Sequence, residues 1–192
     1  MIDKHTELEV LKPQELTNSY QNVKKDFAKY WDKDYINEMM NLIDKPSDRM
    51  FINFLWRTGV RVSEAVSLKK SDIDFNNFMM TVKWLKSRKY NYRVVPLHPT
   101  IKEILQVYTA GLKADDRVFP FTRQNAWRIT KKYLRGHPHQ LRHSFAVNWL
   151  RCKGDIIIWH NILGHSKIQT TMEYLKIVPV DQGKELMKIN FT

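Results

Sequence analysis

The chain has only one cysteine, Cys152, among its 192 residues, which excludes an internal disulfide. A lone thiol fits a protein of a reducing compartment. No apolar run reaches 18 residues and the chain does not open on a signal peptide, so the sequence predicts neither a membrane span nor secretion. Internal repeats and low-complexity tracts are lacking too. These absences together predict a soluble, intracellular protein.

Metal-binding motifs are also lacking, although five histidines fall in the last third of the chain: His137, His139, His143, His160 and His165. Their spacing is not that of a zinc protease, and neither an HExxH motif, a cysteine cluster nor a carboxylate triad accompanies them. We therefore expect no metal site. His143 is interpreted as a structural residue next to Arg142, and His160 as a residue of a helix over 155–163.

Acidic residues are scarce relative to basic ones. Twenty Asp and Glu stand against 32 Lys and Arg, which gives a net charge of +12 and a pI near 9.7. Such an excess predicts a polyanionic partner. An anionic membrane could use the same charge, but no basic amphipathic stretch with a lipid-facing aromatic stripe is found. Nucleic acid is the favoured partner.

The organisation of the chain predicts one domain of mixed but mainly helical structure, because 192 residues with 43% hydrophobic content suffice for one core. Residues 1–30 are polar and read as a lead-in or linker, and residues 31–192 form the domain. The expected helices are 34–43, one capped by Ser47 and ended by Gly59, 62–68, 99–108, 123–134, one from 138, and 155–163. Strands are expected over 78–85 and 92–97, joined by a basic loop over 86–91, and over 118–121.

Four polar side chains between Pro138 and Leu175 suit attack on a phosphate: His139, Arg142, His165 and Tyr174. The arginine fork matches the negative charge on phosphate oxygens and keeps its own charge near neutral pH. A phenol has a pKa of about 10, so it attacks only beside a base or a positive field. A histidine can be that base, because it titrates near pH 7.

With these residues the chain resembles the catalytic domain of the tyrosine recombinases, the phage-integrase family. The family pattern is R…K…H-x-x-R…H…Y. It is matched by Arg61 in TGVRVSEAVSL, a lysine in KWLKSRKYNYRVVPL, His139 and Arg142 in HQLRH, His165 in LGHS, and Tyr174 in TTMEY. The resemblance covers roughly residues 31–178, and six linked elements are far more specific than one short motif. It implies an α+β, mostly helical fold with a small antiparallel hairpin.

The resemblance implies a site-specific recombinase that exchanges DNA strands through a 3′-phosphotyrosyl intermediate formed by Tyr174. Arg61 and Arg142 clamp the phosphate, His139 handles the tyrosine proton, and His165 hydrogen-bonds the phosphate. Lys86 is the expected general acid. Its loop is longer than the common GKGNKxR form, which leaves Lys89 and Lys83 as alternatives. No metal or ATP is needed, because one phosphodiester is exchanged for another ester of similar energy.

Contacts to double-stranded DNA are expected from two basic segments. In the family the hairpin reaches into DNA, which here involves Arg88, Lys89 and Arg93. The helix over 123–134 places aromatic residues between the cations Arg123, Arg128, Lys131 and Lys132, an arrangement that suits a DNA groove. A solvated turn and a solvated helix face are the alternatives.

Several alternatives remain at this level. A type IB topoisomerase shares the chemistry, and a DNA-binding relative without strand exchange shares the fold. Family members commonly carry an N-terminal core-binding domain, so the chain is either a catalytic fragment or a short natural form. The tail over 179–192 begins at Pro179 and offers apolar residues on a short helix capped by Asp181. We expect this tail either to dock on a neighbouring protomer of a tetramer or to pack on its own domain. The cytoplasm of a prokaryotic, archaeal or virus-infected cell is the expected location.

Overall fold

The computed structural model describes residues 30–86, 89–164 and 173–176 of the chain. The described α-helices are α2 (Lys33–Asn41), α3 (Pro46–Thr58), α4 (Val62–Ser67), α5 (Pro99–Tyr108), α6 (Arg123–Leu134), α7 (Pro138–Arg151) and α8 (Ile156–Leu163). Short 3-10 helices are η1 (Lys70–Asp72) and η2 (Glu173–Lys176). Residues 1–29 of the expected lead-in, and the tail over 179–192, lie outside the described residues. None of the described helices is both long and apolar enough to cross a lipid bilayer.

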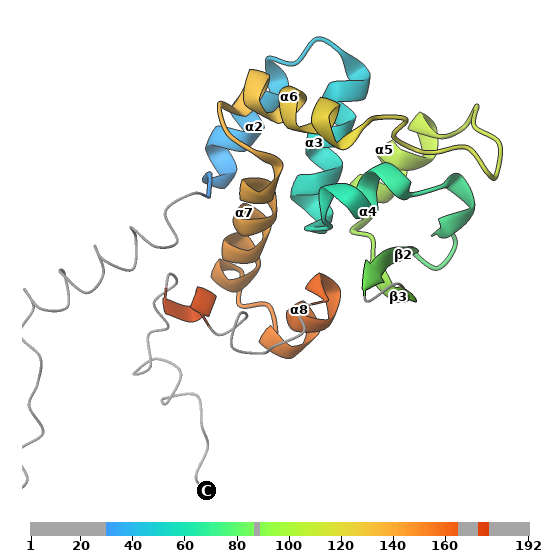
Figure 1. The fold of residues 1–192 in the computed structure, drawn as a ribbon. Helices are drawn as coiled ribbons and strands as arrows, with labels where there is room; N and C mark the ends of the chain where they lie inside the picture. Colours follow the sequence, from blue (N-terminus) through green and yellow to red (C-terminus); the bar gives the residue numbers. More distant parts are fainter. Residues whose placement is uncertain (1–29, 87–88, 165–172, 177–192) are drawn as a thin grey trace, which may run out of the picture.

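A three-stranded antiparallel sheet lies beside the helices, with β2 (Met79–Lys86) between β1 (Ile73–Asp74) and β3 (Lys89–Pro96) (Figure 1). Lys86 pairs with Lys89, so the ladder runs further than the expected strands, and only residues 87 and 88 link them. Tyr90 and Tyr92 favour extended structure, which explains why the expected loop over 86–91 is mostly strand. Strand β1 was not among the strands expected from the sequence. The mostly helical α+β prediction is confirmed.

Helix α3 begins two residues earlier than the sequence predicted. Lys45, in extended conformation, is the N-cap and Pro46 occupies the first turn, where its missing N–H has no consequence. The Ser47 hydroxyl therefore does not cap the helix and donates to the Asp48 carboxylate at 3.4 Å. The end of the helix is as predicted: Gly59 has a φ of +64°, and a Cβ atom there would lie 2.4 Å from Cδ1 of Phe145.

The main core is organised around α3, which packs against α7 and α5. Phe51 and Phe54 of α3 are fully buried, and their rings lie 5.2 and 5.0 Å from that of Phe119. Because α3 ends three residues before Arg61, and α7 carries His139 and Arg142, the packing of these helices sets where the predicted site residues meet.

The expected strand over 118–121 is not formed. The backbone N–H of Val118 donates to the Leu68 carbonyl at 2.9 Å, and bridge pairing is limited to Lys69 and Arg117. Pro120 has no N–H with which to continue a ladder. The segment still contributes to the core, because Val118 and Phe119 are buried.

Candidate active site

Arg61 stands at the turn between α3 and α4, where it is the N-cap residue of α4. Its backbone N–H donates to Oε2 of Glu64 at 2.7 Å, and its Nη1 donates to Oε1 of the same carboxylate at 3.1 Å. Glu64 is therefore hydrogen-bonded to both the backbone and the side chain of Arg61. The Nη2 atom reaches the Gly164 carbonyl at 3.4 Å, which links this turn to the residue before His165.

The Glu64 carboxylate is buried and is shared between two arginines. Arg93 of β3 donates to it through Nη1 at 2.7 Å and Nη2 at 2.9 Å. Burial alone raises the pKa of Glu64, but hydrogen bonds and charge from Arg93, with the N–H and charge of Arg61, outweigh burial and hold that pKa below its usual value. Glu64 is therefore ionised at neutral pH and braces both guanidinium groups.

Arg142 projects from the second turn of α7 into the interior, where only 3% of its surface is exposed. Its Nη1 donates to the Gly59 carbonyl and its Nη2 to the Leu163 carbonyl, both at 2.7 Å. Burial, followed by the charge of Arg61, lowers the pKa of Arg142 to about 9, so the group stays charged at neutral pH. These two bonds use two of the five guanidinium N–H groups and join the turn before Arg61 to the end of α8.

Tyr174 of η2 is buried, with 3% of its surface exposed, and its ring lies edge-on to Trp159 at 5.0 Å. Its hydroxyl is hydrogen-bonded to Nδ1 of His143. The ring of His143 in turn lies 4.6 Å from that of His139, one helical turn away on α7. The nucleophile expected from the sequence is thus tied to the helix that carries His139 and Arg142.

His143 is the site residue that the sequence reasoning missed, because it was interpreted as structural. The sequence did hold a signal for it: His143 follows His139 by four residues, so the two side chains lie on the same face of a helix. Burial, then the positive charges of His139, Arg142 and His137, lower the pKa of His143 to about 4. Although His139 reaches solvent, partial burial and then the charges of Arg142, His137 and Arg61 also lower its pKa. Both imidazoles are therefore neutral at pH 7.

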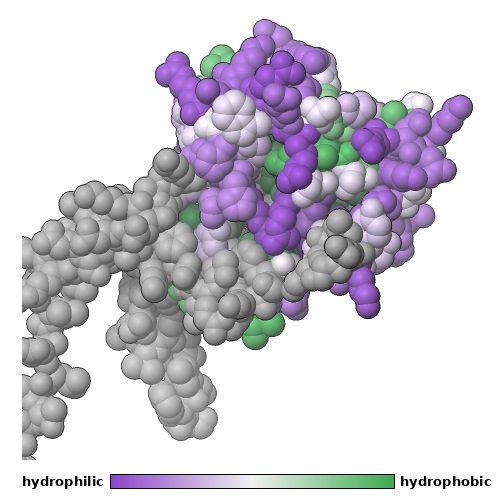
Figure 2. Space-filling view, in the orientation of Figure 1, coloured by the Kyte–Doolittle hydropathy of each residue, from purple (hydrophilic) through white to green (hydrophobic). Residues whose placement is uncertain are grey.

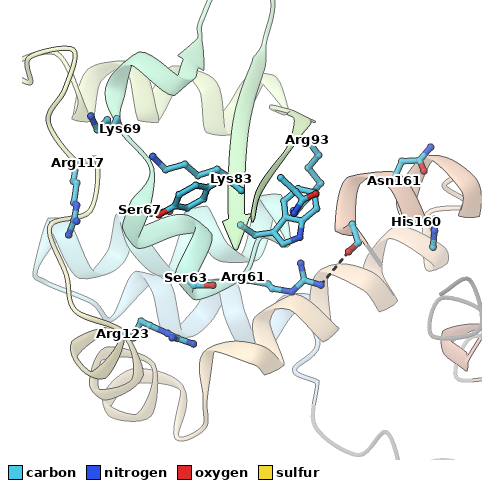
Figure 3. A pocket seen from close by; sticks show the side chains of 14 residues that line it. Arg61, Ser63, Ser67, Lys69, Lys83, Arg93, Arg117, Arg123, His160 and Asn161 are labelled. Atoms are coloured by element: carbon cyan, nitrogen blue, oxygen red, sulfur yellow. Dashed lines mark hydrogen bonds between the residues drawn. The ribbon is translucent and has the colours of Figure 1, made fainter. Parts of the chain in front are cut away.

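Two clefts meet at Arg61. The larger, of about 1160 Å³, is lined by the cations Arg61, Lys69, Lys83, Arg93, Arg117 and Arg123, and no carboxylate is among its described lining residues (Figure 3). The smaller, of about 400 Å³, is lined by Arg61, His139 and Arg142, and also by Arg123 and Trp127. Clefts walled by one sign of charge concentrate counter-ions, so this face is built to receive an anion.

The comparisons with known proteins agree with this geometry. Residues 29–179 match the sequence model of the phage integrase family. The chain belongs to the phage integrase family. It is 32% identical to the tyrosine recombinase XerA of Thermococcus onnurineus over 172 residues, a match covering 81% of this chain and 60% of XerA. The chain thus spans about 60% of the length of that curated relative.

Solved structures give the same fold. A crystal structure of XerA recombinase is 26% identical, covers 82% of this chain and 61% of its own, and superposes with a TM-score of 0.66. The pre-cleavage complex of XerH recombinase bound to its difH substrate is 21% identical, with a TM-score of 0.62 and coverage of 84% and 53%. The second likeness supports the fold alone.

Three of the expected catalytic and DNA-contact residues are not fully described. His165 and Arg88 lie outside the described residues, and only the backbone of Lys86 is described, in the pair with Lys89 at the end of the hairpin. Of the alternative lysines, Lys83 lines the larger cleft and Lys89 is exposed. Figure 3 shows Lys83 extending from β2, on the opposite side of the cleft from Arg123.

Helix α6 carries the other expected DNA contacts on a hydrophilic surface (Figure 2). Arg123 lines both clefts, whereas Arg128, Lys131 and Lys132 lie exposed along the helix. The Lys131 ammonium sits 4.8 Å from the centre of the Trp127 ring. Arg93 differs from the expectation, because its guanidinium is engaged by Glu64 and by the Ile162 carbonyl, and only 9% of its side chain is exposed. Arg93 is therefore bound within the protein and is not expected to be a DNA contact.

Proposed function

We propose that the chain is the catalytic part of a site-specific recombinase that cuts and rejoins double-stranded DNA through Tyr174. The observation that carries the proposal is the shared cleft of Arg61, His139 and Arg142, with the Tyr174 phenol hydrogen-bonded to His143 on the same helix. Two arginines suit a phosphodiester, and a phenol held by an imidazole suits nucleophilic attack on it. Membership of the phage integrase family and the cation-lined clefts support DNA as the substrate.

The proposed reaction begins when the Tyr174 oxygen attacks the scissile phosphorus. The phenol proton passes to His143, which touches the hydroxyl, and toward His139, whose ring lies against His143. Arg61 and Arg142 stabilise the charge that builds on the non-bridging oxygens, and His165 donates a further hydrogen bond. The bond from phosphorus to the 5′ oxygen breaks, and Lys86 gives that oxygen a proton. A 5′ hydroxyl from a partner duplex then reverses these steps.

The test is incubation of the 192-residue chain with a nicked suicide duplex, in which the cleaved fragment diffuses away and the covalent adduct accumulates. We expect a protein–DNA band on a denaturing gel with the natural chain and none with Tyr174→Phe, which loses only the hydroxyl. Equal duplex affinity of the two proteins is the control. An adduct that persists in Tyr174→Phe would overturn the assignment of the nucleophile, and a natural chain without adduct would overturn the function.

We also propose that the domain spans 31–192 after a lead-in over 1–30, acts in the cytoplasm, and assembles as a tetramer on paired DNA sites through the tail over 179–192. The family membership and the basic clefts support an assembly on DNA. Deleting residues 180–192 is expected to leave a folded chain that cleaves a suicide duplex weakly and forms no complex of two duplexes. A truncated chain that joins two duplexes as well as the full chain would contradict this role for the tail.

A further inference from the structure

The C-terminal end of α8 is held by three arginines from three different elements. The Ile162 carbonyl accepts from Nε of Arg93 at 2.7 Å, the Leu163 carbonyl from Arg142 at 2.7 Å, and the Gly164 carbonyl from Arg61 at 3.4 Å. The last carbonyls of a helix have no partner within it and form the negative end of its dipole. Three successive carbonyls are thus satisfied by cations at the residues that lead to His165.

Arg93 differs from the other two arginines because all three of its guanidinium nitrogens are bound to the protein. Nε donates to Ile162, and the two terminal nitrogens form a fork with the Glu64 carboxylate. The group also lies over Trp84, with Cζ 5.4 Å from the ring centre. At Gly164 an added Cβ atom would lie 3.1 Å from Cδ, Nε and Nη1 of Arg93, so this glycine gives the arginine room.

The charges at Glu64 show what Arg93 can do for Arg61. Both arginines form ion pairs with the same buried carboxylate, at 2.7 Å for Arg93 and 3.1 Å for Arg61. Two guanidinium groups and one carboxylate carry a net charge of +1. Without Arg93 the sum is zero, because the carboxylate then neutralises Arg61 alone. A neutralised Arg61 would stabilise the developing charge on a phosphate less well.

We propose that Arg93 is a positioning residue for DNA cleavage, an inference that rests on the proposed function. Through Glu64 it neutralises the carboxylate that braces Arg61, so that Arg61 keeps its charge for the phosphate. Through the Ile162 carbonyl it fixes the end of α8 from which the chain continues to His165. Arg93 does this without contacting DNA itself.

The first test compares Arg93→Gln with Lys113→Gln, a matched loss of one charge at an exposed position on the loop after α5. Adduct formation on a suicide duplex is timed at saturating protein, and duplex affinity is measured separately. For Arg93→Gln we expect a cleavage rate lower by about 10- to 100-fold with affinity within about twofold. For Lys113→Gln we expect a duplex affinity and a cleavage rate close to those of the natural chain. Weaker binding by Arg93→Gln at an unchanged rate would make it a DNA contact.

The second test adds Glu64→Gln to Arg93→Gln, which restores the local charge to +1 and leaves no unpaired carboxylate in the interior. We expect this double variant to cleave faster than Arg93→Gln alone. It also serves if Arg93→Gln fails to fold, because the destabilising change is then a buried carboxylate that has lost its two hydrogen bonds from Arg93. A double variant as slow as Arg93→Gln, or slower, would overturn the charge argument.

A third test uses a duplex with a methylphosphonate at the scissile position. This linkage is neutral, so it lacks the negative charge that Arg61 stabilises on a phosphate. On this neutral linkage we expect the loss caused by Arg93→Gln to shrink to less than about threefold. The same loss on both linkages would mean that Arg93 acts only on general stability. If the natural chain forms no adduct on the phosphate duplex, the proposed function is wrong. If the natural chain forms the adduct and Arg93→Gln forms it at the same rate, only the positioning role of Arg93 is wrong.

Discussion

At the scale of single residues, the arginines of this site bind backbone carbonyls as well as facing a cleft. Arg142 is the clearest case, because its two terminal nitrogens reach carbonyls at the ends of α3 and α8. A guanidinium can hold two acceptors in fixed directions while further N–H groups point elsewhere, and an ammonium cannot. One residue can therefore hold two turns together and still serve a substrate.

Replacing Arg142 by Lys is expected to slow cleavage by about a hundredfold or more, which corresponds to roughly 3 kcal/mol of transition-state stabilisation. The reason is that a point charge replaces neither the fork on the phosphate nor both carbonyl contacts. Suicide-duplex kinetics measure the effect. Arg128→Lys, on the exposed face of α6, is the matched control and should cleave at the natural rate. Equal rates for the two variants would make Arg142 purely structural.

His143 makes a prediction for pH dependence. Its folded-state pKa of about 4 lies below the ordinary value of 6.5, so between these values the unfolded chain binds a proton that the folded chain resists. Stability is therefore complete above about pH 6.5 and falls as the pH drops toward 4. His143→Gln should show a smaller fall over this window in urea unfolding at pH 7, 5.5 and 4. Parallel pH curves for both proteins would contradict it.

At the scale of elements, the ends of helices position the site. Helix α8 begins at the N-cap Asp155, whose Oδ1 accepts from the backbone N–H groups of Ile157 at 2.7 Å and Ile158 at 2.9 Å. It ends at Gly164 in the left-handed conformation, directly before His165. Local chemistry at both ends therefore determines how the chain reaches the site.

Asp155→Ala is expected to destabilise the fold by about 1 kcal/mol, because two N–H groups of α8 lose their acceptor. Chemical denaturation measures the change. Asp32→Ala is the matched control, since Asp32 occupies the N-cap of α2 without a capping bond. Its exposed ion pair with Arg151 should be worth less than about 1 kcal/mol. The cap has no special role if both variants lose the same stability.

Sequence could predict the elements whose signals are local, and it missed those that depend on distant partners. Gly59 and the Leu163–Gly164 break marked helix ends, because a left-handed residue is needed there. The engagement of Arg93 was not predictable, since its partner Glu64 lies 29 positions earlier in the chain and meets it only in the fold. The contact between His143 and Tyr174 spans 31 positions for the same reason.

At the scale of the whole molecule, a net charge of +12 is distributed so that cations line the clefts and continue along α6. A basic surface of this kind binds DNA by displacing counter-ions from phosphates, so affinity falls as salt rises. Arg123 belongs to the clefts, whereas Arg128 and Lys131 extend the basic surface beyond them. Substitutions of Arg128 and Lys131 therefore test the electrostatic contribution to DNA binding separately from the cleavage reaction.

Arg128→Gln and Lys131→Gln are each expected to weaken duplex binding and to reduce the slope of log K against log salt by about 0.9, the contribution of one phosphate contact. Fluorescence anisotropy between 50 and 200 mM salt (roughly the range in which such slopes are linear) measures this. Lys113→Gln, an equal charge change on the loop after α5, should leave the slope nearly unchanged. A loss that is uniform across duplex sequences identifies phosphate contacts, whereas a loss confined to particular sequences would show that α6 reads base edges instead.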